Sequence, residues 1–185
     1  VLPFTFHGDT ALEWLADGFA EQAIGGLARD GLSVPGGGRA FSYRGRDVRE
    51  AGRALQVPMV VTGSVVVVGT QMRVEARLVK VDDGDVVWSL TPFDGDTAAY
   101  FAIADSITAG IVAQLRTRLA GAAGVARRPG PPTRDLQAYA LYVKARQATY
   151  LATSAGLDRA VPLLEEALAR DSAFSDAWVA LADAY

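Results

Sequence analysis

Three arginines follow a glycine-rich stretch in the first third of the sequence and form its strongest candidate anion-binding feature. The run Pro35-Gly36-Gly37-Gly38 directly precedes Arg39, and Arg44 and Arg46 follow within eight residues of it. Backbone amides of a glycine-rich loop can point at a phosphate, but the spacing matches neither a P-loop nor a dinucleotide-binding turn. We therefore expect a plain irregular loop. Binding of a nucleotide or another small anion at Arg39, Arg44 and Arg46 stays open as an alternative.

Three groups of acidic residues invite comparison with catalytic or metal-binding patterns. The run 82–85 (Asp-Asp-Gly-Asp) lacks the twelve-residue ligand series of a calcium loop, so it predicts a tight hairpin turn. His7 and Asp9 lack a nucleophile and a third partner, so a surface or capping role is expected. Three further carboxylates follow at four-residue spacing: Glu13, Asp17 and Glu21. We expect them to lie on one solvated face of a helix. The sequence therefore predicts no catalytic residue and no metal site.

The composition excludes several other classes of protein. The 185 residues include no cysteine and one histidine, which rules out thiol nucleophiles, disulfides and multi-histidine metal sites. The net charge of −3 argues against a nucleic-acid surface. The longest apolar run, Val57 to Val68, is interrupted by Thr62, Gly63 and Ser64 and is too short to span a membrane. We expect a folded chain without a cofactor, nucleic-acid partner or membrane insertion.

A stretch rich in proline and glycine predicts two domains. Residues 121–134 contain Gly121, Gly124 and a Pro-Gly-Pro-Pro run, which a continuous helix or paired strand does not tolerate. Eleven basic and fourteen acidic residues precede Gly121, and seven of each follow. The sequence therefore predicts an acidic domain over 1–120, a linker over 121–134 and a helical domain over 135–185.

The first domain begins with alternating strands and helices. Residues 1–5 read as a buried strand, and Thr10 with Glu13 forms a capping box at the start of a helix. That helix has an apolar stripe of Leu12, Leu15, Phe19, Ala23 and Leu27. Residues 32–34 predict a short second strand, and Asp47 caps a second helix that extends to about Leu55.

Three consecutive strands and a last helix complete the first domain. Residues 58–68 are rich in valine, residues 72–78 alternate apolar with charged side chains, and residues 86–88 follow an Asp-Gly turn. The last helix buries a stripe of Ile103 or Ala104, Ile107, Ile111, Leu115 and Leu119. The order β-α-β-α-β-β-β-α predicts an α/β fold with a mixed five-stranded sheet and flanking helices, followed by a short all-helical segment.

The second domain resembles the start of a tetratricopeptide repeat array. With Ser175 as the first repeat position, the Trp, Leu, small-residue and Tyr positions are occupied by Trp178, Leu181, Ala182 and Tyr185. Ala160, Leu164 and Ala167 match the preceding helix of the repeat. The resemblance implies paired helices that recruit protein partners, with Trp178, Tyr185 and Tyr142 as candidate partner-binding residues. These aromatic side chains could instead fill the core between helices. At most one and a half repeats are present, so an apolar end that supports a homodimer is also expected.

The first domain resembles the amino-terminal-TolB-like domain of bacterial signalling proteins. The resemblance is carried by five patches in order: Val1-Leu2-Pro3-Phe4, Ala16-Asp17-Gly18-Phe19, Phe41-Ser42-Tyr43-Arg44-Gly45-Arg46, Val60-Val61-Thr62-Gly63-Ser64-Val65 and Gly84-Asp85-Val86-Val87-Trp88. It implies a non-catalytic domain that precedes tetratricopeptide repeats. It also implies an upstream Ser/Thr kinase, adenylate cyclase or winged-helix domain, commonly with a membrane helix between. On which side of the membrane this soluble portion lies is left open.

These features predict a non-catalytic regulatory and protein-interaction module of a larger bacterial signalling protein. The chain opens within a strand-like run and without an initiator Met, which led us to expect a piece of a longer protein. Two alternatives remain: a domain that binds a nucleotide or small anion, and a periplasmic scaffold in envelope transport.

Overall fold

The computed structural model describes residues 1–118, 132–150 and 153–185. The chain divides into two compact units, Val1–Arg127 and Arg128–Tyr185. The first is an α/β unit with a five-stranded mixed sheet, and the second consists of helices, so the predicted fold class is confirmed. Most of the expected linker over 121–134 lies outside the described residues. The domain limits of 1–120 and 135–185 therefore stay predictions.

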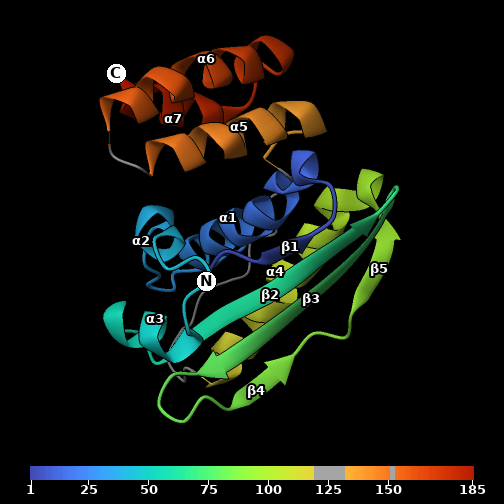
Figure 1. Ribbon diagram of the computed structural model, residues 1–185, viewed down its shortest axis with the longest axis vertical. Coiled ribbons are helices and arrows are strands. Elements are labelled where there is room, and N and C mark those ends of the chain that lie inside the picture. The colour runs from blue at the N-terminus through green and yellow to red at the C-terminus, as the bar shows by residue number, and fades with distance from the viewer. Residues whose placement is uncertain (119–131, 151–152) are drawn as a thin grey trace. The chain divides into compact units, whose positions relative to one another are not determined.

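The sheet is organised around one long hairpin (Figure 1). Its strands are β1 (Thr5–His7), β2 (Met59–Val68), β3 (Gln71–Lys80), β4 (Val86–Ser89) and β5 (Phe93–Asp96). β1 runs parallel to β2, and all other pairs are antiparallel. β4 and β5 both pair with β3, at different ends of that strand. The antiparallel series of β2, β3 and β4 confirms the predicted meander.

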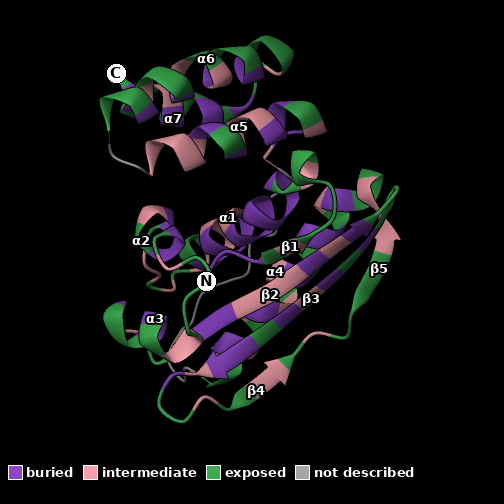
Figure 2. Ribbon diagram, viewed as in Figure 1, coloured by how far each residue is buried: buried purple, intermediate pink, exposed green. Residues whose placement is uncertain are grey.

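The β2–β3 hairpin follows from its sequence. Its register is continuous from Met59 opposite Lys80 to Val68 opposite Gln71, and Gly69 occupies the connecting turn with φ +62°. The alternation in β3 is also observed, because Met72, Val74, Ala76 and Leu78 are buried while the arginines between them are exposed (Figure 2). One face of the hairpin is thus apolar and must pack against other elements to be shielded from water.

Two long helices cover that apolar face (Figure 1). They are α1 (Trp14–Arg29), preceded by the 3-10 turn η1 (Thr10–Leu12), and α4 (Tyr100–Arg118), preceded by η2 (Thr97–Ala99). The described part of the predicted α4 stripe is buried, with Ile103, Ile107 and Ile111 each no more than 1% exposed, while Leu119 lies outside the described residues. Each such side chain stabilises the fold by about 1.5–3 kcal/mol relative to exposure. The helices approach closely, because a Cβ on Gly26 would collide with Thr108.

The segment Thr97–Arg118 is also long and apolar enough, by composition alone, to cross a membrane. This finding among the described residues was not expected, because the sequence analysis took Val57 to Val68 as the longest apolar run. In the α/β unit the apolar side of α4 packs in the core.

Local structure differs from expectation at four places. The buried strand expected over residues 1–5 is wrong, because residues 1–4 are not paired as a strand although residues 2–4 are buried, and β1 covers Thr5–His7 instead. Residues 32–34 form no strand, and β5 supplies the fifth strand of the sheet instead. The glycine-rich run is only partly irregular, because α2 (Gly37–Phe41) begins within it. Thr10 does not cap α1: Asp9 accepts a hydrogen bond from the Ala11 amide and begins η1, and α1 follows that turn directly. The capping role of Asp47 on α3 (Val48–Ala54) is confirmed by its bonds to the Arg49 and Glu50 amides.

The second unit contains the three predicted helices, α5 (Leu136–Thr149), α6 (Ser154–Arg170) and α7 (Ser175–Ala184). Asp135 caps α5 by accepting bonds from the Gln137 and Ala138 amides at 2.8 and 2.9 Å. Gly156 lets α6 approach α5, because a Cβ there would collide with the Ala148 carbonyl. Consecutive helices pack against each other, α5 on α6 and α6 on α7.

Replacement of Gly63 by Ala is expected to destabilise the α/β unit. An added Cβ would overlap the Glu75 carbonyl and lie 2.6 Å from the buried Phe4 ring. Gly63→Ala should lower the free energy of unfolding by about 1–3 kcal/mol, measured by urea denaturation. Gly110→Ala is the control, because its Cβ would meet the Trp88 ring at an ordinary 3.6 Å. The control should be neutral or stabilising by up to about 1 kcal/mol. Equal effects of the two substitutions would contradict the close β2–Phe4 packing.

Candidate functional site

The three candidate anion-binding arginines lie on and after α2. Arg39 is on the helix, while Arg44 and Arg46 occupy the turns that lead to α3, where Gly45 has φ +70°. All three residues are exposed. The structure thus places them in one short segment, but it gives Arg44 a specific partner.

Arg44 already pairs with two acidic residues at the start of α1. Its Nη2 donates to Asp17 Oδ1 at 2.5 Å, and its Nη1 lies 3.9 Å from Glu13 Oε1. The guanidinium also stacks 5.5 Å from the centre of the Phe41 ring. Part of the positive charge that an anion would need is therefore already neutralised within the protein.

Asp17 is the exception to the expected solvated acidic face. Its side chain is buried, with the residue only 6% exposed, so this part of the sequence prediction is wrong. Burial raises the pKa of the Asp17 carboxyl, and the hydrogen bond and charge of Arg44 oppose that rise. The Arg44–Asp17 pair therefore fastens the α2–α3 segment to α1, and its chemistry is that of a structural contact.

A second arginine fastens the far end of the same helix. Arg116 near the end of α4 forms a bidentate pair with Asp30, with Nε–Oδ2 and Nη2–Oδ1 distances of 2.6 and 2.5 Å. Asp30 ends α1. This side-chain geometry is the strong one for an arginine and a carboxylate. Arg116 and Asp30 are 86 positions apart in the sequence, and no sequence pattern predicted that they pair.

The other acidic patterns have structural roles. Asp9 caps η1, and His7 is an exposed residue of β1 opposite Val66. Asp83 accepts bonds from the Asp85 amide and from Lys80 Nζ, and Gly84 adopts φ +85°, which is the hairpin turn that the sequence predicted. Among the described residues no three His, Asp or Glu side chains gather in a way that could hold a metal ion.

The most distinctive surface of the helical unit is one side of α7, which we call the α7 face. It comprises the four residues at tetratricopeptide positions, namely Trp178, Leu181 and Ala182 of α7 and Tyr185, which directly follows the helix. Trp178 is 53% and Tyr185 86% exposed, whereas Ala177, Ala180 and Ala184 of the same helix are buried. Neither side chain is packed in a core formed by the described helices, and partner binding by Trp178 and Tyr185, with core filling as its alternative, stays a prediction. The indole of Trp178 is oriented by donation from Nε1 to the Ser172 carbonyl at 2.9 Å.

Tyr142 has a different environment from the other two candidate partner-binding residues. It is half-buried in an aromatic cluster, 5.0 Å from the Phe174 ring and 6.0 Å from the Tyr139 ring. Phe174 is fully buried and anchors the turn between α6 and α7. The sequence analysis did not single it out, since a lone phenylalanine in a turn gives no periodic signal.

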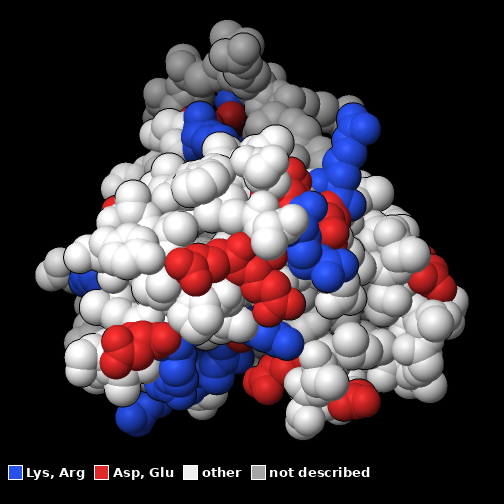
Figure 3. Space-filling model, turned by 90° about the horizontal axis from the view of Figure 1, so that it is seen from above, with Lys and Arg blue, Asp and Glu red and all other residues white. Residues whose placement is uncertain are grey.

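Charged side chains of both signs are interspersed on the surface. The face in Figure 3 shows acidic groups beside basic ones, separated by uncharged residues. Several of the described basic residues have acidic partners, including Arg73 with Asp94 and Arg170 with Asp135. This arrangement suits selective protein contacts better than a broad attraction for polyanions.

Comparison with known proteins connects the chain to a larger protein. No protein-family model matches the sequence. A curated protein of Rhizobium meliloti (strain 1021), named "Putative adenylate cyclase 3", is 34% identical to it over 152 residues. The match covers 80% of this chain but 26% of that protein, so the chain spans about a quarter of the relative's length. The chain is thus a distant homologue of one region of a larger protein.

Removal of Arg44 is expected to shift the titration of Asp17. In Arg44→Met the pKa of Asp17 should rise further, because burial persists while the opposing hydrogen bond and charge are lost. Carboxyl-carbon NMR across a pH series measures it. Arg46→Met is the control and should leave the pKa of Asp17 as in the parent. Equal Asp17 titration in both variants would contradict the pairing.

The same group sets a pH dependence of stability. Because the pKa of Asp17 is raised on folding, the folded chain binds its proton more tightly than the unfolded chain between the ordinary and the raised value. This group's contribution to the free energy of unfolding therefore decreases as pH rises through that window. The decrease should be absent from Asp17→Asn, as read from urea denaturation at several pH values.

The α7 face is expected to make the chain self-associate. Burial of a large aromatic side chain contributes about 1.5–3 kcal/mol, so Trp178→Ser should weaken association by about tenfold or more. Sedimentation velocity over a concentration series and binding of an apolar dye measure the effect. Val179→Ser, which alters a residue 62% exposed but outside the α7 face, should behave as the parent. A parent chain that stays monomeric and binds no dye would refute the expectation.

Proposed function

We propose that the chain is a non-catalytic regulatory and protein-interaction module of a larger signalling protein. The observation that carries the proposal is the α7 face, which presents Trp178 and Tyr185 to solvent on a helix otherwise packed by alanines. An exposed aromatic surface on a rigid helix is the usual anchor of a protein contact. In this proposal the helical unit recruits the partner and the α/β unit docks or senses.

The resemblances to the amino-terminal-TolB-like domain and to tetratricopeptide repeats supply the finer form of the proposal. The α/β unit has a parallel β1–β2 pair with helices between them in sequence, followed by a meander and a last helix. The second unit has three helices that pack consecutively and carry the repeat residues on α7. Both features support that assignment, in which neither unit contains catalytic residues.

Homology favours an adenylate cyclase among the effectors considered. The Rhizobium protein is about four times as long as the region that it shares with this chain, which leaves room for a separate catalytic domain. Its name describes a cyclase. We infer that the shared region modulates such an effector through the orientation of its two units, because a bound partner favours the arrangement to which it binds more tightly.

Anion binding at Arg39, Arg44 and Arg46 is a weaker proposal. The Arg44 guanidinium is already paired with Asp17 and Glu13, so an anion would have to compete with two carboxylates. A regulatory module that works through protein contacts does not need that site.

The proposal is tested by separating catalysis from regulation. The 185-residue chain, incubated with ATP and Mg²⁺, should form no cyclic AMP. A hybrid in which this chain replaces the homologous stretch of the Rhizobium protein should form cyclic AMP at a rate that depends on the α7 face. Trp178→Ser combined with Tyr185→Ser should change that rate by about fivefold or more, as expected for a coupling of 1 kcal/mol or above.

Val179→Ser in the same hybrid is the matched control and should leave the rate unchanged. Cyclic AMP formation by the isolated chain would overturn the non-catalytic assignment. Identical rates for the control and the double variant would overturn the role of the α7 face.

A further inference from the structure

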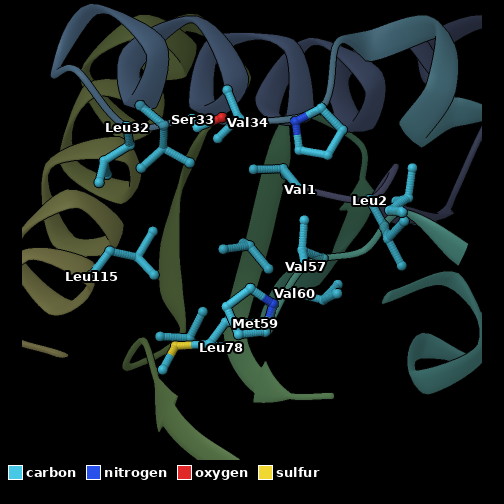
Figure 4. A pocket seen from close by; sticks show the side chains of 15 residues that line it. Val1, Leu2, Leu32, Ser33, Val34, Val57, Met59, Val60, Leu78 and Leu115 are labelled. Atoms are coloured by element: carbon cyan, nitrogen blue, oxygen red, sulfur yellow. The ribbon is translucent and has the colours of Figure 1, made fainter. Parts of the chain in front are cut away.

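The α/β unit contains an apolar cavity, partly open to solvent, that the contacts described so far do not use. Its volume is about 220 Å³. It lies between the sheet and the loop that follows α1, with one wall formed by the end of α4 (Figure 4). Side chains from three different elements point into this common space, among them Leu32 of the loop, Leu78 of β3 and Leu115 of α4.

The chemistry of the walls is uniform. Among the described residues that line the cavity, Ser33 is the only one with a polar side chain and none has a charged side chain. The amino group of Val1 also lies there, and burial lowers its pKa to about 6. Val61, Leu78 and Leu115 are 3%, 1% and 7% exposed, so the floor and side wall belong to the packed core. A charged ligand would lose its hydration there, and the Val1 amino group offers little compensating charge because its lowered pKa leaves it mostly neutral near pH 7.

The loop over the cavity is the element that can admit a ligand. The Leu32 amide donates to the Leu27 carbonyl at 3.0 Å, but residues 33–35 form no backbone hydrogen bond with any other described residue. Leu32, Val34 and Pro35 are half-buried, so they close the cavity with apolar side chains and little backbone support. The loop could therefore move without breaking the sheet.

The size of the cavity is that of a small organic molecule. Protein interiors are close-packed, so an empty space of this volume leaves its lining atoms without contacts on one side. An apolar cavity of about 150 Å³ stays dry and takes up benzene in a well-studied engineered protein. The cavity described here is larger and equally apolar.

We propose that this cavity binds a compact, uncharged, apolar small molecule that carries at most one hydrogen-bonding group, placed at Ser33. Such a ligand would be a signal to which the regulatory module responds. That role rests on the function proposed above, whereas binding itself rests on the cavity alone. Binding is a property of the α/β unit, whereas partner contact is a property of α7. Either proposal can therefore fail while the other stands.

The first experiment compares two probes that have the same chain length and different charge. The 185-residue chain with labelled Leu and Val methyl groups is titrated with 1-octanol and, separately, with octanoate. The methyl NMR signals of Leu78 and Leu115 should shift and saturate with 1-octanol. Those of Leu164, which is buried in the helical unit, should not move. Both titrations are run near pH 8, where the Val1 amino group is neutral. Octanoate should then produce shifts only at concentrations at least about tenfold higher, because its carboxylate meets no charged side chain in the cavity.

The second experiment fills the opening of the cavity. Val34→Phe places a bulkier side chain at a half-buried loop position and should weaken 1-octanol binding by about tenfold or more. Val68→Phe makes the same chemical change at a residue 75% exposed beside the β2–β3 turn and should bind as the parent does. Circular dichroism verifies that both variants are folded.

Three results would overturn the inference. Leu78 and Leu115 signals that do not move at saturating 1-octanol would show that the cavity takes no ligand of this class. Equal affinity for octanoate would refute the requirement for an uncharged molecule. Unchanged binding in a folded Val34→Phe variant would place the ligand elsewhere.

Discussion

The pairing of β2 with β3 is the constraint on which the α/β unit depends. Ten consecutive residue pairs join these strands without a register shift, and every other strand of the sheet pairs with one of them. A slip by one residue would turn Val61 and Leu78 outward and expose the whole apolar face to water. The close contact of Gly63 with Phe4 adds a second restraint, because it seats the first segment of the chain on the hairpin.

Arginine in this protein serves mainly to connect elements that are distant in sequence. Arg44 joins the α2–α3 segment to α1, and Arg116 joins the end of α4 to the residue that ends α1. Each pair includes a carboxylate with little exposure, where removal of one partner leaves the other charge poorly solvated. This use of arginine explains why the basic cluster after the glycine run is less available to an anion than its sequence indicates.

Two apolar features of the described residues differ in kind. The α7 face is open and aromatic, so it offers the large rigid contact area that protein interfaces favour. The cavity behind residues 32–35 is concave and aliphatic, which suits a small molecule. A module with one surface for a partner and one cavity for a ligand has the two separate sites that coupling requires.

Elements with a periodic or local signal could be predicted from the residues alone: the alternation of β3, the stripe of α4, the cap at Asp47 and the three helices of the second unit. Such patterns depend on which side of an element is buried, and neighbouring residues carry that information. Three other features became known from the folded chain: residues 32–34 form a loop over a cavity, Asp17 is buried against Arg44, and Trp178 faces solvent. Each of these features depends on the neighbours that a residue gains, or lacks, from distant parts of the chain. The spacing of nearby residues carries no information about those neighbours.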